Sequence, residues 1–320
     1  MKAAVYYENG PPSVFRYEDV PDPKCHPKGV VIRVAAVSIE GGDLLHRAGA
    51  PLTSRPHVVG YQAAGEIVEL GAEVTQLRVG QRVVTVDAAG SHAELRAVAA
   101  RNCWVVPASA DLRAIAGTPI PFGTADDCLF EFGRLRAGET VLVQGGGGGV
   151  GLAAIQLAKR AGATVLATAS SGEKLERLRA YGMDHGINYR DDDLVRETRR
   201  LTNGRGADLI VDPIGGTTLQ QSLAALAYRG RIAWVGRAGR ELVKHDVSTL
   251  MQGNQSLIGV FLGAEIATDR VHDMIQRHVD DVAAGKLAVV IDREFPLRDA
   301  AAAHAFIESR KAFGRVLLIP

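Results

Sequence analysis

The chain has 320 residues, of which 47% are hydrophobic and 23% are charged, and its formal net charge is +1. This length suggests two domains, with ample apolar material for buried cores. The near-neutral charge argues against a nucleic-acid or membrane-surface partner.

No apolar run approaches the roughly 18 residues of a membrane span, and the amino terminus lacks the apolar stretch of a signal peptide. The three cysteines, Cys25, Cys103 and Cys128, are widely spaced and odd in number, so they support neither a disulfide framework nor a cysteine zinc cluster. We therefore expect a cytoplasmic protein.

The first third of the chain is rich in short segments typical of β-strands, with turn residues between them. Four such strands are expected over 1–7, 30–37, 65–71 and 79–86. Short strands with this spacing predict an antiparallel, barrel-like unit.

From about Thr124, apolar strands alternate with helices, which predicts a doubly wound parallel sheet. Its six strands are expected over 141–144, 164–168, 187–189, 208–212, 231–236 and 257–262, with helices such as 172–181 and 218–228 between them. The remaining segments are helices over 269–284 and 299–310 and strands over 289–291 and 315–319. We expect them to return to the first unit, so the predicted domains are 1–123 with 263–320, and 124–262.

A glycine-rich loop connects the first strand of this sheet to a helix over 152–159. Gly146, Gly148 and Gly151 fit the G-x-G-x-x-G spacing, in which glycines allow a sharp turn, close approach of a pyrophosphate and tight packing of the helix. The strand before and the helix after the loop favour a dinucleotide site over a structural turn. A methyltransferase-type nucleotide loop is the alternative.

The end of the second strand indicates which dinucleotide binds. A site for NAD places Asp or Glu about 20 residues beyond the glycines, on the ribose 2′-hydroxyl. Here the strand end carries Ser170 and Ser171, with Lys174 one turn further on, and no carboxylate. This pattern predicts NADP(H) and also disfavours a methyltransferase. The alternative is an ordinary helix cap and a solvated lysine.

Several segments together resemble the zinc-free quinone oxidoreductase branch of the medium-chain dehydrogenase/reductase superfamily, the ζ-crystallin-like proteins. The resemblance covers nearly the whole chain and depends on residues 1–3, 60–68, 79–83, 138–143, 187–190, 212–216 and 314–317 together with the glycine loop. It implies an α/β protein with a GroES-like β-barrel domain and a Rossmann domain, and it implies NADPH as cofactor. It also implies hydride transfer to a quinone or to the activated C=C of an α,β-unsaturated carbonyl, and a homodimer or homotetramer joined through the last Rossmann strand, 257–262.

The positions that hold zinc in zinc-dependent relatives differ here. Those relatives place Cys three residues before the residue matching Asp43, and His-Glu after the residue matching Gly60. This chain has Glu40, Tyr61 and Gln62 at these positions. Because one carboxylate cannot supply a tetrahedral zinc site, we expect no metal, and simple alcohol oxidation is disfavoured.

Zinc-free relatives also differ from this chain around the expected site. Asn-Pro commonly precedes the aspartate that matches Asp43, where this chain has Glu40-Gly41-Gly42. Two acids, Asp126 and Asp127, follow 123–125, where an apolar or aromatic residue is usual. These departures leave open a pathway-specific enoyl-thioester or carbonyl reductase. A noncatalytic NADPH-binding or sensor protein is a third reading.

The family positions supply candidate site residues. Tyr61 and Thr124 are expected near the nicotinamide, with Tyr61 as hydrogen-bond donor to the developing enolate oxygen; its alternative is a core aromatic. Glu40 is a candidate proton relay with a raised pKa if it is buried, and its alternative is a salt bridge to Arg47 or His46. The expected cofactor-binding residues are Thr124, Gly148, Gly149, Val150, Ser170, Lys174, Tyr189, Val235, Gly236, Phe261, Leu262 and Arg315.

Overall fold

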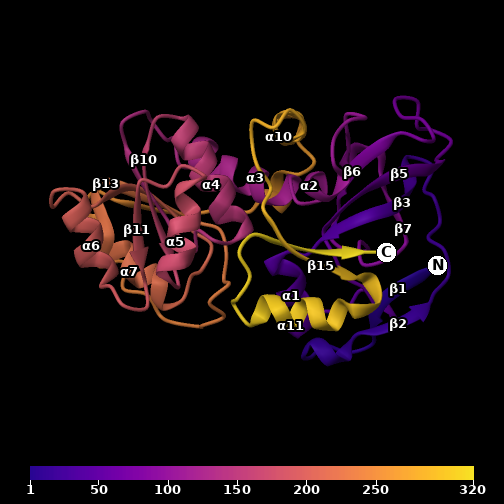
Figure 1. Ribbon diagram of the computed structural model, residues 1–320, viewed down its shortest axis with the longest axis horizontal. Helices are drawn as coiled ribbons and strands as arrows, with labels where there is room; N and C mark the ends of the chain where they lie inside the picture. Colours follow the sequence, from indigo (N-terminus) through magenta and orange to yellow (C-terminus); the bar gives the residue numbers. More distant parts are fainter. The chain divides into compact units, whose positions relative to one another are not determined.

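The computed structural model describes residues 1–320 and divides the chain into two compact units (Figure 1). The first unit consists of Met1–Ile120 and Glu265–Pro320, and the second of Pro121–Ala264. The first unit is therefore discontinuous in sequence. None of the helices is long and apolar enough to cross a membrane.

A seven-stranded sheet forms the core of the first unit. Its order is β15-β16-β3-β5-β6-β8, with β7 also paired to β3. Neighbouring strands are antiparallel except β15 and β16, which confirms the predicted antiparallel, barrel-like unit. The strands are β3 (Gly29–Ser38), β5 (Gln62–Leu70), β6 (Arg82–Val86), β7 (Leu95–Ala99), β8 (Cys103–Val105), β15 (Ile291–Pro296) and β16 (Arg315–Ile319).

A second, three-stranded sheet in this unit has the order β2-β1-β4. Its strands are β1 (Lys2–Tyr6), β2 (Arg16–Asp19) and β4 (His57–Val58). The unit also contains helices α2 (Leu112–Ala116), α10 (Asp269–Ala283) and α11 (Ala300–Glu308). The strand expected over 289–291 is wrong in position, because the pairing with β16 begins only at Ile291.

One helix of the first unit, α1 (Gly41–Gly49), is absent from the sequence-based expectation. Glycines at both ends lower the helix propensity of this segment, so the sequence pattern does not predict a helix there. The backbone N–H of Glu40 donates to Asp43 Oδ2 at 2.8 Å, so the aspartate side chain ties the helix start to the end of β3.

The second unit is a six-stranded parallel sheet with the order β11-β10-β9-β12-β13-β14, which confirms the doubly wound Rossmann architecture. Its strands are β9 (Thr140–Val143), β10 (Thr164–Ala169), β11 (His185–Asn188), β12 (Ala207–Asp212), β13 (Leu226–Trp234) and β14 (Ser256–Gly259). Its helices are α4 (Gly149–Arg160), α5 (Gly172–Arg179), α6 (Leu194–Leu201), α7 (Thr217–Ala225), α8 (Ser248–Gln252) and α9 (Leu262–Glu265); α3 (Pro119–Asp126) enters it from the first unit.

Strand order reverses between β9 and β12. Right-handed crossovers therefore place α4 and α5 on one face of the sheet and α7 on the other. The carboxyl ends of all six strands meet at one edge, and the crevice where the order reverses is the usual place for a bound dinucleotide.

The last strand, β14, ends at Gly259, whereas the sequence predicted a strand through Leu262. The prediction is wrong at this end because β13 stops at Trp234, which pairs with Gly259 and leaves no partner beyond it. Leu262 instead begins α9.

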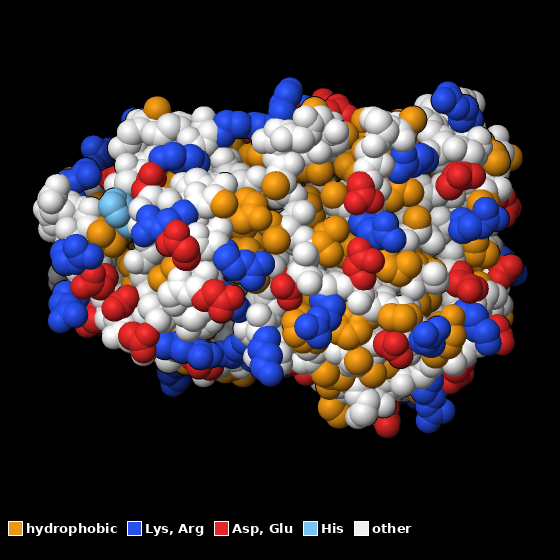
Figure 2. Space-filling model, viewed as in Figure 1, with side chains coloured by type: hydrophobic (Ala, Val, Ile, Leu, Met, Phe, Trp, Pro, Cys, Tyr) orange, Lys and Arg blue, Asp and Glu red, His pale blue; other side chains and the backbone are white.

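Acidic and basic side chains are interspersed over the face of the protein drawn in Figure 2. This mixture matches the net charge of +1. No field of a single sign extends across that face.

Candidate functional site

The glycine loop between β9 and α4 has the packing that a phosphate-binding turn requires. A Cβ on Gly151 would lie 2.4 Å from the Gly145 carbonyl oxygen, and one on Gly146 would lie 2.8 Å from Leu178 Cδ1. Both glycines therefore allow α4 and α5 to pack close to the turn. Gly148, the N-cap of α4, differs, because a Cβ there would meet only the Gly145 oxygen, at 3.4 Å.

A series of buried polar side chains holds this loop from beneath, and no local sequence pattern predicts it. Thr168 Oγ1 accepts from the Gly145 N–H at 2.9 Å and donates to Gln144 Oε1 at 2.9 Å. Gln144 Nε2 donates to Ser222 Oγ, which donates to Asp212 Oδ2. Each residue adjoins or lies in an element of the central sheet or α7, so the loop is fixed to the rigid part of the unit.

Most of the other predicted cofactor residues lie near the same edge of the sheet. Ser170 follows β10, and Ser171 caps α5 by accepting from the Lys174 N–H at 3.3 Å. Tyr189 follows β11 and is 46% exposed. The pair Val235-Gly236 follows β13, and Trp234 Nε1 donates to the Gly236 oxygen at 2.7 Å.

The remaining cofactor candidates lie elsewhere in the chain. Thr124 is buried in α3. Phe261 follows β14 and is 74% exposed, whereas Leu262 is buried at the start of α9. Arg315 lies in the first unit, where its guanidinium already has protein partners.

These features fit a bound NADP(H). The free N–H groups at the start of α4, with the open side of Gly148 in front of them, suit a pyrophosphate. The hydroxyls that follow β10, together with the Lys174 ammonium, suit a 2′-phosphate better than a free ribose hydroxyl.

In the first unit, Glu40 lies at the centre of a buried polar network. Its Oε1 atom accepts hydrogen bonds from Arg315 Nη2 and Gln62 Nε2. Arg315 Nε also donates to Ser38 Oγ at 2.9 Å, and Gln62 Oε1 accepts from the Ile120 N–H at 3.0 Å. The salt bridge weighed for Glu40 is thus made to Arg315 and not to Arg47 or His46, and Arg47 pairs with Glu308 at 2.5 Å.

Burial shifts the acid–base properties of this network. It raises the pKa of Glu40 to about 7, although the Arg315 cation and the hydrogen bonds from Gln62 and Arg315 oppose the rise. It raises the pKa of Asp43 to about 8, and Asp43 Oδ1 has no hydrogen-bond partner. Burial, with the nearby Asp43 and Glu40 carboxyls, raises the pKa of Tyr61 to about 12. Tyr61 and most of the Asp43 population are therefore protonated at neutral pH, whereas Glu40 is protonated in part.

Tyr61 packs against the first turn of α1. A Cβ on Gly42 would lie 2.2 Å from Tyr61 Cε2 and 2.8 Å from its hydroxyl oxygen. The neighbouring Gly41 has nothing within 4 Å of the same position. The structure thus brings the Tyr61 ring next to the helix that begins after Glu40.

The residues at the positions expected for zinc do not suit that ion. The single carboxylate, Glu40, is already paired with a guanidinium, and Gln62 uses both ends of its amide in hydrogen bonds. The Tyr61 hydroxyl keeps its proton at neutral pH. A structural or catalytic zinc needs three or four Cys, His or carboxylate ligands, so no step of the chemistry is assigned to a metal.

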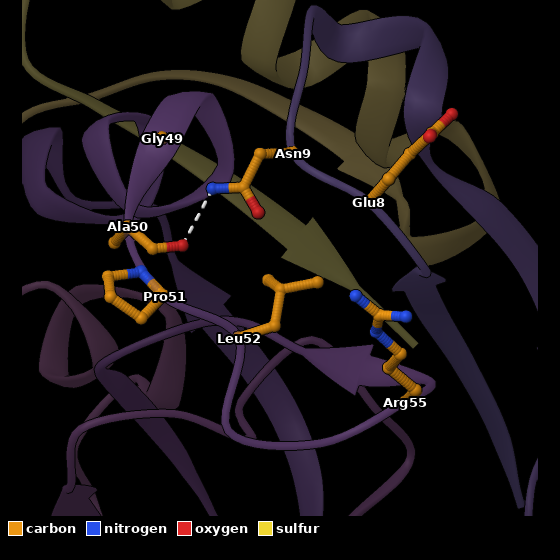
Figure 3. Close-up of a pocket in the computed structure, with 7 residues that line it drawn as sticks. All are labelled: Glu8, Asn9, Gly49, Ala50, Pro51, Leu52 and Arg55. Carbon is orange, nitrogen blue, oxygen red and sulfur yellow. Dashed lines mark hydrogen bonds between the residues drawn. The ribbon is translucent and has the colours of Figure 1, made fainter.

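A surface pocket of about 400 Å³ lies at the other end of α1 (Figure 3). Figure 3 shows the Asn9 amide directed at Ala50, whose oxygen it binds at 2.7 Å, and the Glu8 carboxylate pointing away from Arg55. A helix of nine residues separates this pocket from Glu40 by about 13 Å along its axis. Asn9 donates hydrogen bonds to carbonyl oxygens at the end of α1, where the helix supplies too few N–H partners. The pocket is therefore separate from the Glu40 cluster.

Comparison with known proteins gives consistent results for both units. Residues 149–279 match the zinc-binding dehydrogenase family, and residues 26–118 match the alcohol dehydrogenase GroES-like domain. The 2-haloacrylate reductase of a Burkholderia species is 33% identical, with 100% of this chain and 99% of that protein covered. Quinone oxidoreductase of Pseudomonas aeruginosa is 30% identical over 97% of each chain. The crystal structure of Escherichia coli quinone oxidoreductase complexed with NADPH has a TM-score of 0.94, at 27% identity over 100% of both chains.

Proposed function

Because the chain belongs to the zinc-free quinone oxidoreductase branch of the medium-chain dehydrogenase/reductase superfamily, we propose that it reduces a quinone or the activated C=C of an α,β-unsaturated carbonyl, using NADPH. The observation that supports this most directly is the presence, in one chain, of the glycine loop and of the Glu40–Gln62–Tyr61 cluster, whose side chains do not suit zinc. Relatives with these activities are named for a quinone and for a 2-haloacrylate.

The second unit binds and orients the cofactor. When bound, NADPH supplies the hydride. The N–H groups of Gly149 and Val150 would hold the pyrophosphate, and Gly148, whose own N–H donates to the Gly145 oxygen at 3.0 Å, would leave room for it. The Lys174 ammonium, with Ser170, would hold the 2′-phosphate. Tyr189, Val235 and Gly236 line the same edge of the sheet. Thr124, Phe261 and Leu262 remain our candidates for the nicotinamide side.

Tyr61 supplies the hydrogen bond that the reaction needs at oxygen. When a hydride adds to an enone or a quinone, negative charge develops on the carbonyl oxygen, and a positioned donor there lowers the barrier. A phenol whose pKa is raised to about 12 stays protonated throughout the neutral range, so Tyr61 is a donor and not an anion.

Glu40 relays the proton that completes the product. A carboxyl with a pKa of about 7 is protonated in part of the population at neutral pH and exchanges its proton readily. Arg315 and Gln62 both hold the Oε1 atom, which fixes the orientation of the carboxyl group. For Arg315 we therefore prefer this orienting role to a contact with the cofactor phosphates.

The donor assignment is tested by Tyr61→Phe, assayed with NADPH and both a benzoquinone and a 2-haloacrylate. The loss of one general acid or oxyanion donor lowers kcat about 100-fold, while the NADPH dissociation constant stays unchanged. Glu40→Gln should lower kcat and abolish its dependence on pH near 7. Wild-type rates in Tyr61→Phe would remove this tyrosine from the mechanism.

We also propose that two copies of the chain associate through β14. This strand is the edge of the second sheet, and an unpaired edge invites pairing with another strand. Large apolar side chains near it are exposed: Tyr228 at 68%, Met251 at 80% and Phe261 at 74%. Sedimentation analysis of the wild type and of Phe261→Glu tests the dimer, which the substitution should dissociate.

We propose a cytoplasmic location, where NADPH is supplied. Cell fractionation tests this location.

A further inference from the structure

Arg96 is a fully buried cation without a carboxylate partner in a hydrogen bond or ion pair. It lies on β7 and is 1% exposed. A buried charge normally requires a counter-ion or a complete set of hydrogen bonds. Here backbone carbonyls and the Thr85 hydroxyl accept from Nη1 and Nη2 in place of a counter-ion, whereas Nε has no partner. Two of these carbonyls belong to Gly60 and Tyr61.

The guanidinium of Arg96 gathers the carbonyls of two loops. Nη2 donates to the oxygens of Tyr61 at 2.9 Å, Ala89 at 3.0 Å, Gly60 at 3.2 Å and Asp87 at 3.4 Å. Nη1 donates to Thr85 Oγ1 at 3.0 Å and to the Thr85 oxygen at 3.3 Å. One side chain thus connects residues 60–61 with residues 85–89.

Tyr61 lies in the short segment between two strands, where the regular sheet pairing is interrupted. The strand β4 ends at Val58, and β5 begins only at Gln62. Gly60, immediately before it, has a φ of +118°, and a Cβ there would lie 1.8 Å from Ser91 Oγ. The Tyr61 oxygen accepts from the Asp87 N–H at 2.8 Å and from Arg96.

We propose that Arg96 is a positioning residue, which holds the backbone of Tyr61 so that the phenol hydroxyl stays against the first turn of α1 and aligned with the substrate oxygen. This inference depends on the proposed role of Tyr61. It goes beyond that role by assigning the orientation of the donor to a cation that touches neither substrate nor cofactor. An error of about 1 Å in the position of a donor can cost about 100-fold in rate.

A double-mutant cycle between Arg96 and Tyr61 tests the proposal. Arg96→Met should lower kcat about 30- to 100-fold and leave the NADPH dissociation constant unchanged, because the residues that bind the cofactor lie in the second unit. In the Tyr61→Phe background the same substitution should change kcat by no more than about twofold, because the hydroxyl that it misplaces is already absent.

Arg82→Met is the matched control. Arg82 lies on β6 of the same unit, and its guanidinium also donates to backbone carbonyls, including those of Pro107 at 3.4 Å and Ala110 at 2.5 Å, but it makes no contact with 60–61. A general loss of barrel rigidity would lower kcat in Arg82→Met and Arg96→Met alike. The proposal predicts near wild-type kcat for the control.

Arg96→Lys keeps the test decisive if Arg96→Met does not fold. Lysine retains the charge but has a single nitrogen, so it cannot keep the contacts of Nη2 with residues 60–61 and 87–89 together with those of Nη1 with Thr85. It should fold, lower kcat about 10-fold, and lose this effect in the Tyr61→Phe background. If the two substitutions lower kcat independently, so that their factors multiply in the double variant, the positioning role of Arg96 is wrong. Wild-type kcat in Arg96→Lys would also reject that role, and neither result would affect the donor role of Tyr61. Wild-type kcat in Tyr61→Phe would instead overturn the donor assignment beneath it.

Discussion

Glu40 accepts a hydrogen bond from the guanidinium of Arg315, although 275 positions of sequence separate them. The register of the sheet explains the contact. Because Leu317 stands opposite Ser38 in the antiparallel pairing of β16 with β3, Arg315 falls opposite Glu40 two residues further along. The returning end of the chain thus supplies the cation for a carboxyl at the centre of the proposed site.

The pH dependence of kcat should follow the Glu40–Arg315 pair. Glu40 acts in its protonated form, so kcat should fall as pH rises through about 7. Arg315 stabilises the ionised form and holds the pKa down. Arg315→Met should therefore move the fall to higher pH by about one unit or more. A midpoint that stays fixed or moves to lower pH would contradict the assignment. Arg113→Met, which breaks an exposed pair with Glu294, serves as control.

Two neighbouring glycines of α1 allow the position of Tyr61 to be changed without touching Tyr61. In Gly42→Ala the new methyl group meets the Tyr61 ring at 2.2 Å, so the ring must shift. We expect kcat to fall about 10- to 100-fold with NADPH binding unchanged. Gly41→Ala has open space at the same position and should retain wild-type kcat. Steady-state rates of the pair decide the matter, and equal rates would mean that the ring position is unimportant.

The sequence predicted the architecture well because each unit has a strong local signal. Alternating strands and helices predicted the doubly wound sheet, and the spacing of Gly146, Gly148 and Gly151 predicted the turn. Helix α1 escaped prediction because glycines at both ends mask it. The Arg315 partner of Glu40 escaped because only the register of β16 on β3 brings it there. A local sequence pattern cannot predict contacts that depend on sheet register. It also cannot predict the hydrogen bonds from Arg96 to backbone carbonyls such as that of Tyr61.

The glycines of the cofactor loop should respond differently to substitution. Gly151→Ala forces a Cβ to 2.4 Å from the Gly145 oxygen, so it should lower the free energy of unfolding by about 1–3 kcal/mol as well as weaken NADPH binding. Gly148→Ala adds a methyl group on the open side of the loop. It should weaken NADPH binding with little change in melting temperature. Binding titrations and thermal melts of both variants check this, and unchanged NADPH affinity in Gly148→Ala would place the pyrophosphate elsewhere.

Lys174 should discriminate between the two nicotinamide dinucleotides. If its ammonium contacts the 2′-phosphate, Lys174→Ala weakens NADPH binding by about 1–3 kcal/mol and leaves NADH nearly unaffected. Lys159→Ala, at the far end of α4 and paired with Asp184 at 2.6 Å, should change neither affinity. Fluorescence titration with both dinucleotides gives the answer. Equal losses for both, or no loss for either, would discard the proposed contact.

The most direct measurement of the central claim is NADPH oxidation by the purified wild-type protein with a benzoquinone, a simple enone, a 2-haloacrylate, an enoyl thioester and an aldehyde, each with and without a strong zinc chelator. The account predicts turnover of the quinone or of a conjugated C=C compound, with NADPH preferred to NADH and with rates unaffected by the chelator. Loss of activity on chelation, or turnover of the aldehyde alone, would contradict it. NADPH binding without turnover of any acceptor would indicate a noncatalytic NADPH-binding protein instead.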